Sequence, residues 1–337
     1  ENAKKMMTLG GGSSELKVKY EISPLQGIES YFTPASQVTY AEGYSSVHTQ
    51  NRHALLLEAV DAARKADVVI FVGGLNKNEN QDCEGADRRS LNLPYGQDEL
   101  IGELARVNRN LVAVIISGNA VAMPWVNEVP AIVEAWYGGT EAGNAIASVL
   151  AGEVNPSGKL PFTFPVRLED NPAIALDAYP GDGKQVEYKE GIFVGYRWND
   201  RERIKPLFCF GHGLSYTTFE YGKVTAEGRQ MGPDGTITVS VPVKNTGSRA
   251  GAETVQLYVS DLKSSLPRPV KELKGFRKIT LQPGQEQTVS FTIDRKALSF
   301  YDDTKQDWVA EPGAFEALVG ASAYDIRGKA AFELTAQ

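Results

Sequence analysis

Helical patterns alternate with short, continuous apolar runs between residues 52 and 165, and this alternation constrains the fold more than any other feature. The runs are "DVVIFVGG" from residue 67, "LVAVIISG" from residue 111 and "AIVEAWYG" from residue 131. Runs that are apolar at almost every position are typical of strands buried on both faces, as in a parallel sheet. The sequence therefore predicts an α/β domain with a mostly parallel sheet and helices on both of its faces.

Three segments around these runs carry apolar residues at the spacing of amphipathic helices. They are "NRHALLLEAVDAARKA" from residue 51, "YGQDELIGELARVN" from residue 95 and "TEAGNAIASVLAGE" from residue 140. The third helix is expected to end near Gly152, because glycine readily takes the left-handed conformation that follows a helix. We assign residues 1–165 to this α/β domain.

From about residue 219 the pattern changes to short runs in which apolar and polar residues alternate between Gly, Pro and Asn turns. The runs are "TITVSVPVKNTG", "AETVQLYVSD", "KELKGFRKITLQPG", "EQTVSFTID" and "GAFEALVGAS". Alternation of this kind is typical of strands with one face in a core, and several in succession predict an antiparallel, immunoglobulin-like sandwich. We assign residues 219–337 to this all-β domain. The segment between, residues 166–218, is rich in Pro, Gly and aromatic residues and is expected to be a connector packed between the two domains.

Composition limits the partners. The chain has 35 basic and 42 acidic residues and a net charge of −7. This balance offers no electrostatic attraction to nucleic acid or to an anionic membrane. No apolar run reaches the length of a membrane-spanning helix. A neutral substrate suits such a chain, and we expect neither nucleic acid nor a membrane as a partner.

The segment "NENQDCEGADRRSLNLPYGQDELI", from residue 78, is the strongest candidate for chemistry. It follows the first apolar run, so it lies at the carboxyl end of a strand, where open α/β sheets bind ligands. Glu79, Asp82, Glu84 and Asp87 fall close together there. One carboxyl could act as general acid and base while another shapes the loop.

A metal site and a catalytic thiol are the other readings of this segment. Its carboxylates could supply oxygen ligands, but their spacing differs from that of an EF-hand, and the two arginines that follow would oppose a cation. We therefore expect no metal. Cys83 and Cys209 are the only cysteines and are expected to be free thiols, with one cross-link between them as the alternative. No histidine is near Cys83 in the sequence, which argues against a catalytic thiol and against zinc.

Two further segments are weaker candidates. The stretch "GGGSS" at residues 10–14 departs from both phosphate-binding glycine fingerprints, which counts against a flavodoxin-like nucleotide binder, and no cofactor is expected. Ser13 or Ser14 could instead donate a hydrogen bond to a neutral ligand. Glu190 and Asp200 alternate with aromatic residues, and for these we favour a structural role.

Six motifs together resemble, in order, the C-terminal half of glycoside hydrolase family 3. They are "GGGSS…SPLQGI", "DCEGADRRSLNLPYGQDELI", "SGNAVAMPW", "WYGGTEAGNAIASVLAGEVNPSGKLPFTFP", "YKEGIFVGYRWND" and "PLFCFGHGLSYTTFEY". The resemblance covers essentially the whole chain and points to three-domain β-glucosidases and β-xylosidases. It implies an α/β sandwich domain followed by a fibronectin type III-like domain.

The resemblance also implies a reaction, the hydrolysis of terminal β-linked sugars of an oligosaccharide or glycoside with retention of configuration. Retention needs two carboxyl groups about 5 Å apart. In this family an aspartate on a preceding barrel is the nucleophile, and a glutamate in the acidic "EG-x-DR" loop is the acid/base. That role carries over to Glu84, with Glu79 as second choice. The family's serine that can reach the bound sugar corresponds to Ser13.

An acid/base must hold a proton near neutral pH. We expect neighbouring carboxylates such as Asp82 to raise the pKa of Glu84. Arg88 would oppose this, so we expect it to face Asp87.

The barrel and the first strand of the α/β domain are missing from the sequence. We therefore expect this chain to be part of a larger β-glycosidase, with β-glucosidase first, and to be inactive alone. A non-catalytic carbohydrate-binding or scaffolding module is the alternative. The resemblance further suggests a periplasmic or secreted protein, and a homodimer is left open.

Overall fold

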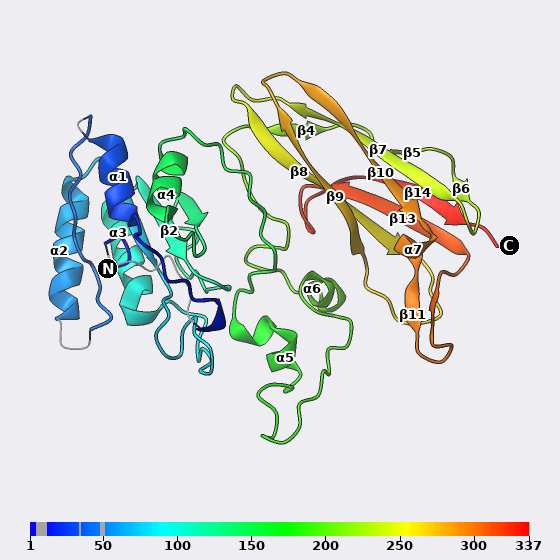
Figure 1. The fold of residues 1–337 in the computed structure, drawn as a ribbon, viewed down its shortest axis with the longest axis horizontal. Coiled ribbons are helices and arrows are strands. Elements are labelled where there is room, and N and C mark those ends of the chain that lie inside the picture. Colours follow the sequence, from blue (N-terminus) through cyan, green and yellow to red (C-terminus); the bar gives the residue numbers. More distant parts are fainter. Residues whose placement is uncertain (5–11, 34, 48–50, 337) are drawn as a thin grey trace. The chain divides into compact units, whose positions relative to one another are not determined.

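The computed structural model describes residues 1–4, 12–33, 35–47 and 51–336. Within them the chain forms two compact units, Glu1–Val154 and Asn155–Gln337, each taken by itself below (Figure 1). In the predicted glycine-rich segment, Gly10 and Gly11 lie outside the described residues. The finer division at residues 165 and 218 stays a prediction.

The first unit contains the predicted parallel sheet. Strands β1 (Val69–Gly74), β2 (Leu111–Ile116) and β3 (Ala131–Glu134) lie in the order β1-β2-β3, and both pairs are parallel. Strand β2 in the centre is almost wholly buried, as its unbroken apolar sequence requires. Because all three strands run the same way, Gly74, Ile116 and Glu134 end at one edge of the sheet. The predicted fold class is thereby confirmed for this unit.

Among the residues that the structure describes, four α-helices accompany the sheet. They are α1 (Pro24–Phe32), α2 (Arg52–Lys65), α3 (Gln97–Val107) and α4 (Ala142–Leu150). Helix α1 packs on α4, and α2 packs on α3 (Figure 1). Gly152 follows α4 with a φ of +74°, as predicted from its position. We did not predict α1, although Ser23 and Gln26 form a capping box at its start.

Two glycines allow α1 and α4 to approach closely. A Cβ on Gly27 would lie 2.1 Å from the carbonyl oxygen of Gly143, and one on Gly143 would lie 2.1 Å from that of Ser23. The backbones of the two helices are therefore in direct contact at this point.

The carboxyl end of β1 is fixed to the start of α3. Gln97, fully buried at the first position of α3, accepts a hydrogen bond from the Gly74 N–H at 2.7 Å and donates one to the Gly74 carbonyl at 2.8 Å. Gly74 has a φ of +130° and lies against the backbone of Ile116. The long segment between β1 and α3, residues 75–96, thus leaves and rejoins the sheet at fixed points.

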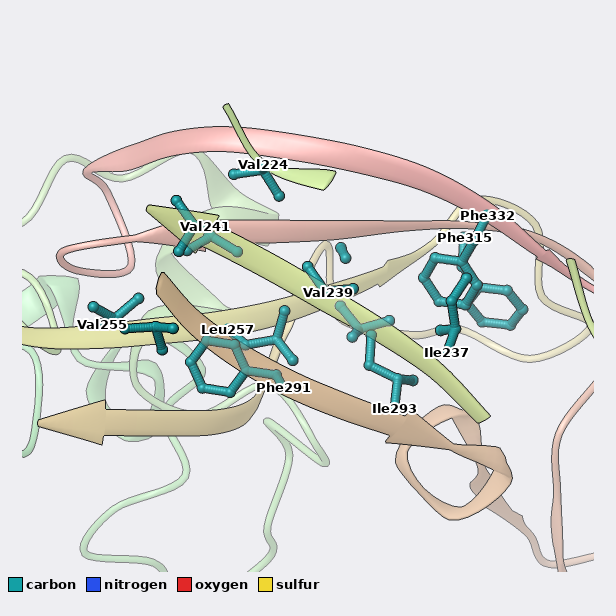
Figure 2. Packing of buried hydrophobic residues seen from close by; sticks show 14 of the residues in the cluster. Val224, Ile237, Val239, Val241, Val255, Leu257, Phe291, Ile293, Phe315 and Phe332 are labelled. Atoms are coloured by element: carbon teal, nitrogen blue, oxygen red, sulfur yellow. The ribbon is translucent and has the colours of Figure 1, made fainter. Parts of the chain in front are cut away.

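The second unit contains the predicted β-sandwich. Its two main sheets have the strand orders β6-β14-β13-β8-β9 and β10-β7-β4, with β5 also paired to β7. Apolar residues of β7, β8, β10, β13 and β14 meet in one core (Figure 2). The strands are β4 (Phe219–Tyr221), β5 (Thr225–Ala226), β6 (Gln230–Met231), β7 (Thr236–Asn245), β8 (Gly251–Asp261), β9 (Glu272–Leu281), β10 (Glu286–Asp294), β13 (Gly313–Gly320) and β14 (Ile326–Leu334). The short helix α7 (Arg295–Leu298) and the hairpin of β11 (Phe300–Asp302) and β12 (Asp307–Val309) lie between β10 and β13.

The aromatic segment before the sandwich is ordered, with two short helices, α5 (Pro172–Ala175) and α6 (Tyr196–Glu202). Tyr196 of α6 lies edge-on to Tyr258 of β8, with ring centroids 5.8 Å apart. Asp200 of α6 pairs with Lys271, and both side chains are nine-tenths buried. The segment packs on the sandwich through these contacts, and its expected place between the two domains stays a prediction.

Candidate active site

Glu84 and Ser13, the two predicted site residues, lie together although they are 71 positions apart in the sequence. Glu84 is in the segment that follows β1. Its Oε2 accepts hydrogen bonds from the Ser13 backbone N–H at 2.8 Å and from the Ser13 Oγ at 2.6 Å. Both residues are exposed. The arrangement presents a carboxylate with an adjacent hydroxyl to solvent.

Gly12 makes this contact feasible. Its φ is +82°, a conformation that residues with a side chain rarely adopt. A Cβ at Gly12 would lie 2.7 Å from the Cβ of Glu84, closer than two such atoms can approach. Glycine at this position thus allows the backbone of the 12–14 turn to pass directly over Glu84.

The expected rise in the pKa of Glu84 is wrong for this structure. The hydrogen bond from the Ser13 hydroxyl, followed by the one from its backbone N–H, lowers the pKa of Glu84 below its ordinary value. Both bonds stabilise the carboxylate form. The carboxylate that we expected to oppose them, Asp82, faces a different set of partners.

Asp82 points toward the edge of the sheet. Its Oδ2 accepts hydrogen bonds from the Gly118 N–H at 2.7 Å and from the Tyr137 hydroxyl at 2.6 Å. Its Oδ1 accepts one from the side-chain amide of Asn119. Gly118 and Asn119 follow β2, and Tyr137 follows β3. Asp82 therefore ties the loop that carries Glu84 to the carboxyl ends of both neighbouring strands.

Arg88 does not face Asp87, contrary to our expectation. Its guanidinium donates to the side-chain oxygen of Asn119, to the carbonyl of Ala120 at 2.7 Å and to the carbonyl of Leu91 at 3.0 Å. The carbonyls of Ala120, after β2, and of Leu91, in the loop itself, attract it because they need donors and lie beside the half-buried guanidinium. Arg88 thus holds the second half of the loop.

The first half of the loop is held by its own polar residues. The Asp82 N–H donates to the carbonyl of Asn76 at 3.0 Å, and the Asn76 N–H donates to the side chain of Gln81 at 3.2 Å. Gln81 in turn donates to the Tyr95 hydroxyl at 2.9 Å. Glu79, our second choice, is exposed, and its carboxylate has no hydrogen bond to any residue in the described ranges. This half of the loop is anchored around Asn76 rather than through Glu79.

Glu134, which we did not single out, is the second carboxyl at this edge of the sheet. It is the last residue of β3. Its Oε1 lies 3.1 Å from the Ser117 Oγ and 3.3 Å from the Trp136 N–H. Burial, and to a smaller degree the charge of Asp82, raises the pKa of Glu134 to about 8. A carboxyl at the end of an apolar run, after Ala131, Ile132 and Val133, was the signal in the sequence that could have found it.

The remaining candidates have structural surroundings. Cys83 and Cys209 are free thiols, as predicted. Asp200 is the partner of Lys271 described above, whereas Glu190 has a buried Oε2 without a hydrogen bond to a described residue. In the described ranges no three His, Cys, Asp or Glu side chains converge on a point that could hold a metal ion. Likewise, no helix there has the length and apolar character needed to cross a membrane.

Comparison with known families identifies the class of protein. Residues 1–196 match the family description "Glycosyl hydrolase family 3 C-terminal domain", and residues 253–323 match "Fibronectin type III-like domain". An α/β unit with a carboxylate-bearing loop beyond its parallel sheet, followed by such a β-sandwich, thus defines the C-terminal portion of a glycoside hydrolase. The chain belongs to glycosyl hydrolase family 3, and the predicted resemblance is confirmed.

Individual relatives are β-glucosidases. The chain is 54% identical to beta-glucosidase BoGH3A of Bacteroides ovatus over 99% of its own length and 46% of that protein. It is 44% identical to thermostable beta-glucosidase B of Acetivibrio thermocellus over 96% of its own length and 42% of that protein. The chain therefore spans about half the length of the curated relatives that it matches.

Solved structures agree. A Bifidobacterium adolescentis family 3 beta-glucosidase superimposes with a TM-score of 0.89 at 36% identity, covering 96% of this chain and 47% of that one. The beta-glucosidase of Kluyveromyces marxianus in complex with glucose superimposes with a TM-score of 0.80 at 40% identity, covering 86% of this chain and 34% of that one.

Proposed function

We propose that this chain is the C-terminal portion of a retaining β-glucosidase and that Glu84 is the general acid/base of the reaction. The observation that carries the proposal is the position of Glu84. It is an exposed carboxylate beyond the carboxyl edge of a parallel sheet, held on one side by the turn at Ser13. The names of the relatives, all β-glucosidases, support glucose as the sugar that is released.

The reaction then has two steps, and each includes one proton transfer. In the first, an aspartate of the preceding barrel attacks the anomeric carbon, the glycosidic bond breaks, and Glu84 gives its proton to the leaving oxygen. In the second, Glu84 takes a proton from the water that attacks the glycosyl-enzyme, and the bond to the aspartate breaks. Glu84 must therefore alternate between carboxylic acid and carboxylate.

Ser13 supplies a means for this alternation. Its two hydrogen bonds favour the carboxylate, the form that acts as base in the second step. A sugar hydroxyl that competes for the Ser13 Oγ would remove the stronger of the two bonds, and the pKa of Glu84 would then rise toward the value that an acid needs. Substrate binding is thus coupled to protonation of Glu84.

The test uses a polypeptide that carries both this chain and the barrel. Glu84→Ala is expected to slow hydrolysis of cellobiose, in which glucose is a poor leaving group, by about 10²–10⁴-fold, since general acid catalysis is worth that much. With an activated aryl glucoside the rate of the first step should fall far less. Added azide should restore turnover, because it replaces water in the second step.

Glu79→Ala is the matched control, because Glu79 is an exposed glutamate of the same loop. It should behave like the wild type with both substrates. A crippled Glu79→Ala beside a normal Glu84→Ala would move the acid/base role to Glu79. Normal activity in both variants would favour a non-catalytic module. The 337-residue chain alone should show no glycosidase activity, because the proposed nucleophile is on the barrel; measurable turnover by it would contradict the proposal. A periplasmic or secreted location and a homodimer remain part of the proposal.

A further inference from the structure

We propose that Glu134 is a positioning residue that has to carry a proton for the Glu84 loop to keep its shape. The structural part of this inference concerns the described residues alone, and only its consequence for catalysis rests on the proposed function. Three observations carry it, namely the count of hydrogens at Ser117, the surroundings of Glu134 and the connection from Ser117 to Asp82.

The count of hydrogens at Ser117 favours a proton on Glu134. The Ser117 Oγ lies 2.8 Å from the carbonyl oxygen of Asn119 and 3.1 Å from the Oε1 of Glu134. A hydroxyl has one hydrogen, and a backbone carbonyl can only accept. With a proton on Glu134, the Ser117 hydroxyl donates to Asn119 and accepts from the carboxyl. Without that proton, two acceptors must share one hydrogen.

Most of the surroundings of Glu134 oppose a negative charge, although the Trp136 N–H lies 3.3 Å from its Oε1. Its Oε2 is buried and has no hydrogen-bond partner among the described residues, a costly position for half of a carboxylate. From the segment after β1, the Asp82 carboxylate faces it, and from the segment after β3 comes the neutral phenol of Tyr137. The cation of this cluster, Arg88, donates to Asn119, Ala120 and Leu91 instead. Burial, the largest cause, and the Asp82 charge together outweigh the hydrogen bonds from Ser117 and Trp136 that lower the pKa of Glu134, and they raise it to about 8.

The turn after β2, which the Ser117 hydroxyl stabilises, also anchors the loop that carries Glu84. Gly118 and Asn119, directly after Ser117, donate to Asp82, and Asn119 also accepts from Arg88. Asp82 is two residues before Glu84. Loss of the proton would place a second negative charge near Asp82 and withdraw the Ser117 hydrogen from the turn. The contacts between the loop and the sheet would weaken, and Glu84 would lose its fixed position.

Cys83 is a built-in reporter of this loop. It lies between Asp82 and Glu84 and is half-buried, whereas Cys209 is buried. The experiment measures the alkylation rate of Cys83 by iodoacetamide under native conditions, by mass spectrometry, from pH 6 to 9.5 in the polypeptide that carries the barrel. Every thiol reacts faster as it ionises, so each variant is compared with the wild type at the same pH.

Glu134→Gln keeps a neutral donor to Ser117 and cannot ionise. The wild-type rate divided by the Glu134→Gln rate should be near one at pH 6.5 and should rise several-fold with a midpoint near pH 8, the pKa of Glu134. A ratio that stays constant over the whole range would overturn the inference.

Ser117→Ala provides a second, independent test, which also applies if Glu134→Gln fails to fold. It removes the hydroxyl between Glu134 and the turn, so Cys83 should react faster than in the wild type at pH 6.5 and at the same rate at pH 9.5. Equal rates at both pH values would again overturn the inference. Since labelling needs no catalysis, it can succeed even if Glu84→Ala has normal activity, and the two proposals fail separately.

Discussion

Replacing Gly143 with alanine should destabilise the α/β unit, although alanine is the better helix former. The new Cβ would lie 2.1 Å from the carbonyl oxygen of Ser23, more than an ångström inside ordinary contact distance. The opposing atom belongs to a backbone that also caps α1, so it cannot turn aside as a flexible side chain could. Helices α1 and α4 must therefore separate.

The size of the expected change in the free energy of unfolding follows from two opposing effects. Overpacking of this kind costs about 1–3 kcal/mol, and replacing a helical glycine, here the second residue of α4, returns at most about 0.5–1 kcal/mol. Because the clash is with backbone, we take the upper part of the first range and expect a net loss of about 1–2 kcal/mol. For a unit of this size the loss lowers the midpoint of thermal unfolding by about 2–8 °C.

Gly102 offers the matched control. It lies inside α3, and a Cβ there would meet nothing within 4 Å. Gly102→Ala should therefore gain the helix-propensity term alone, about 0.5–1 kcal/mol, and raise the midpoint. Calorimetry of the 337-residue chain measures both variants. A Gly143→Ala chain as stable as the Gly102→Ala chain would refute the reasoning, because it would mean that the two backbones are not in contact.

Two further substitutions test the site and the second unit. Ser13→Ala removes a hydrogen bond that lowers the pKa of Glu84, so the pKa of Glu84 should rise. In the barrel-containing polypeptide the alkaline limb of the kcat/KM profile should then move to higher pH. An unmoved limb would mean that Ser13 does not control the protonation of the acid/base. Asp200→Asn leaves the buried ammonium of Lys271 without its charge partner and should cost about 3–5 kcal/mol. Urea unfolding measures this loss, and a loss below 1 kcal/mol would class the pair with exposed ion pairs.

The elements that carry a strong hydrophobic period could be predicted from the sequence. The continuous runs at residues 69–74 and 111–116 became neighbouring parallel strands, and the alternating run at 236–245 became β7. Helix α1 was missed because its nine residues include a glycine on the buried face, which weakens the apolar pattern. The signal was in its cap instead, where Ser23, Pro24 and Gln26 form the start of a helix.

The candidate site was only partly predictable. Period and spacing could place the acidic loop beyond β1, but the pairing of Ser13 with Glu84 depends on a fold that joins residues 71 positions apart. The pKa of Glu84 could not be predicted from its neighbours in sequence, because a nearby carboxylate raises it only if the two side chains face each other. Glu134 was hidden for a similar reason, since in the sequence it is one polar residue in an apolar run.

The opposite directions of Asp82 and Glu84 explain how one loop can have a fixed backbone and still present an exposed carboxylate. Both carboxylate oxygens of Asp82 accept hydrogen bonds from residues that follow the two neighbouring strands, and this fixes the backbone of the loop. Glu84, two residues later, is thereby held in place without needing contacts to the sheet, and its only protein partner in the described ranges is the turn at Ser13. A general acid/base needs such a division, because a carboxyl fixed by many hydrogen bonds could not release and regain a proton in each cycle. The proton that we propose for Glu134 serves the same division, since a neutral carboxyl near Asp82 can hold the turn at Ser117 without adding a second charge to the site.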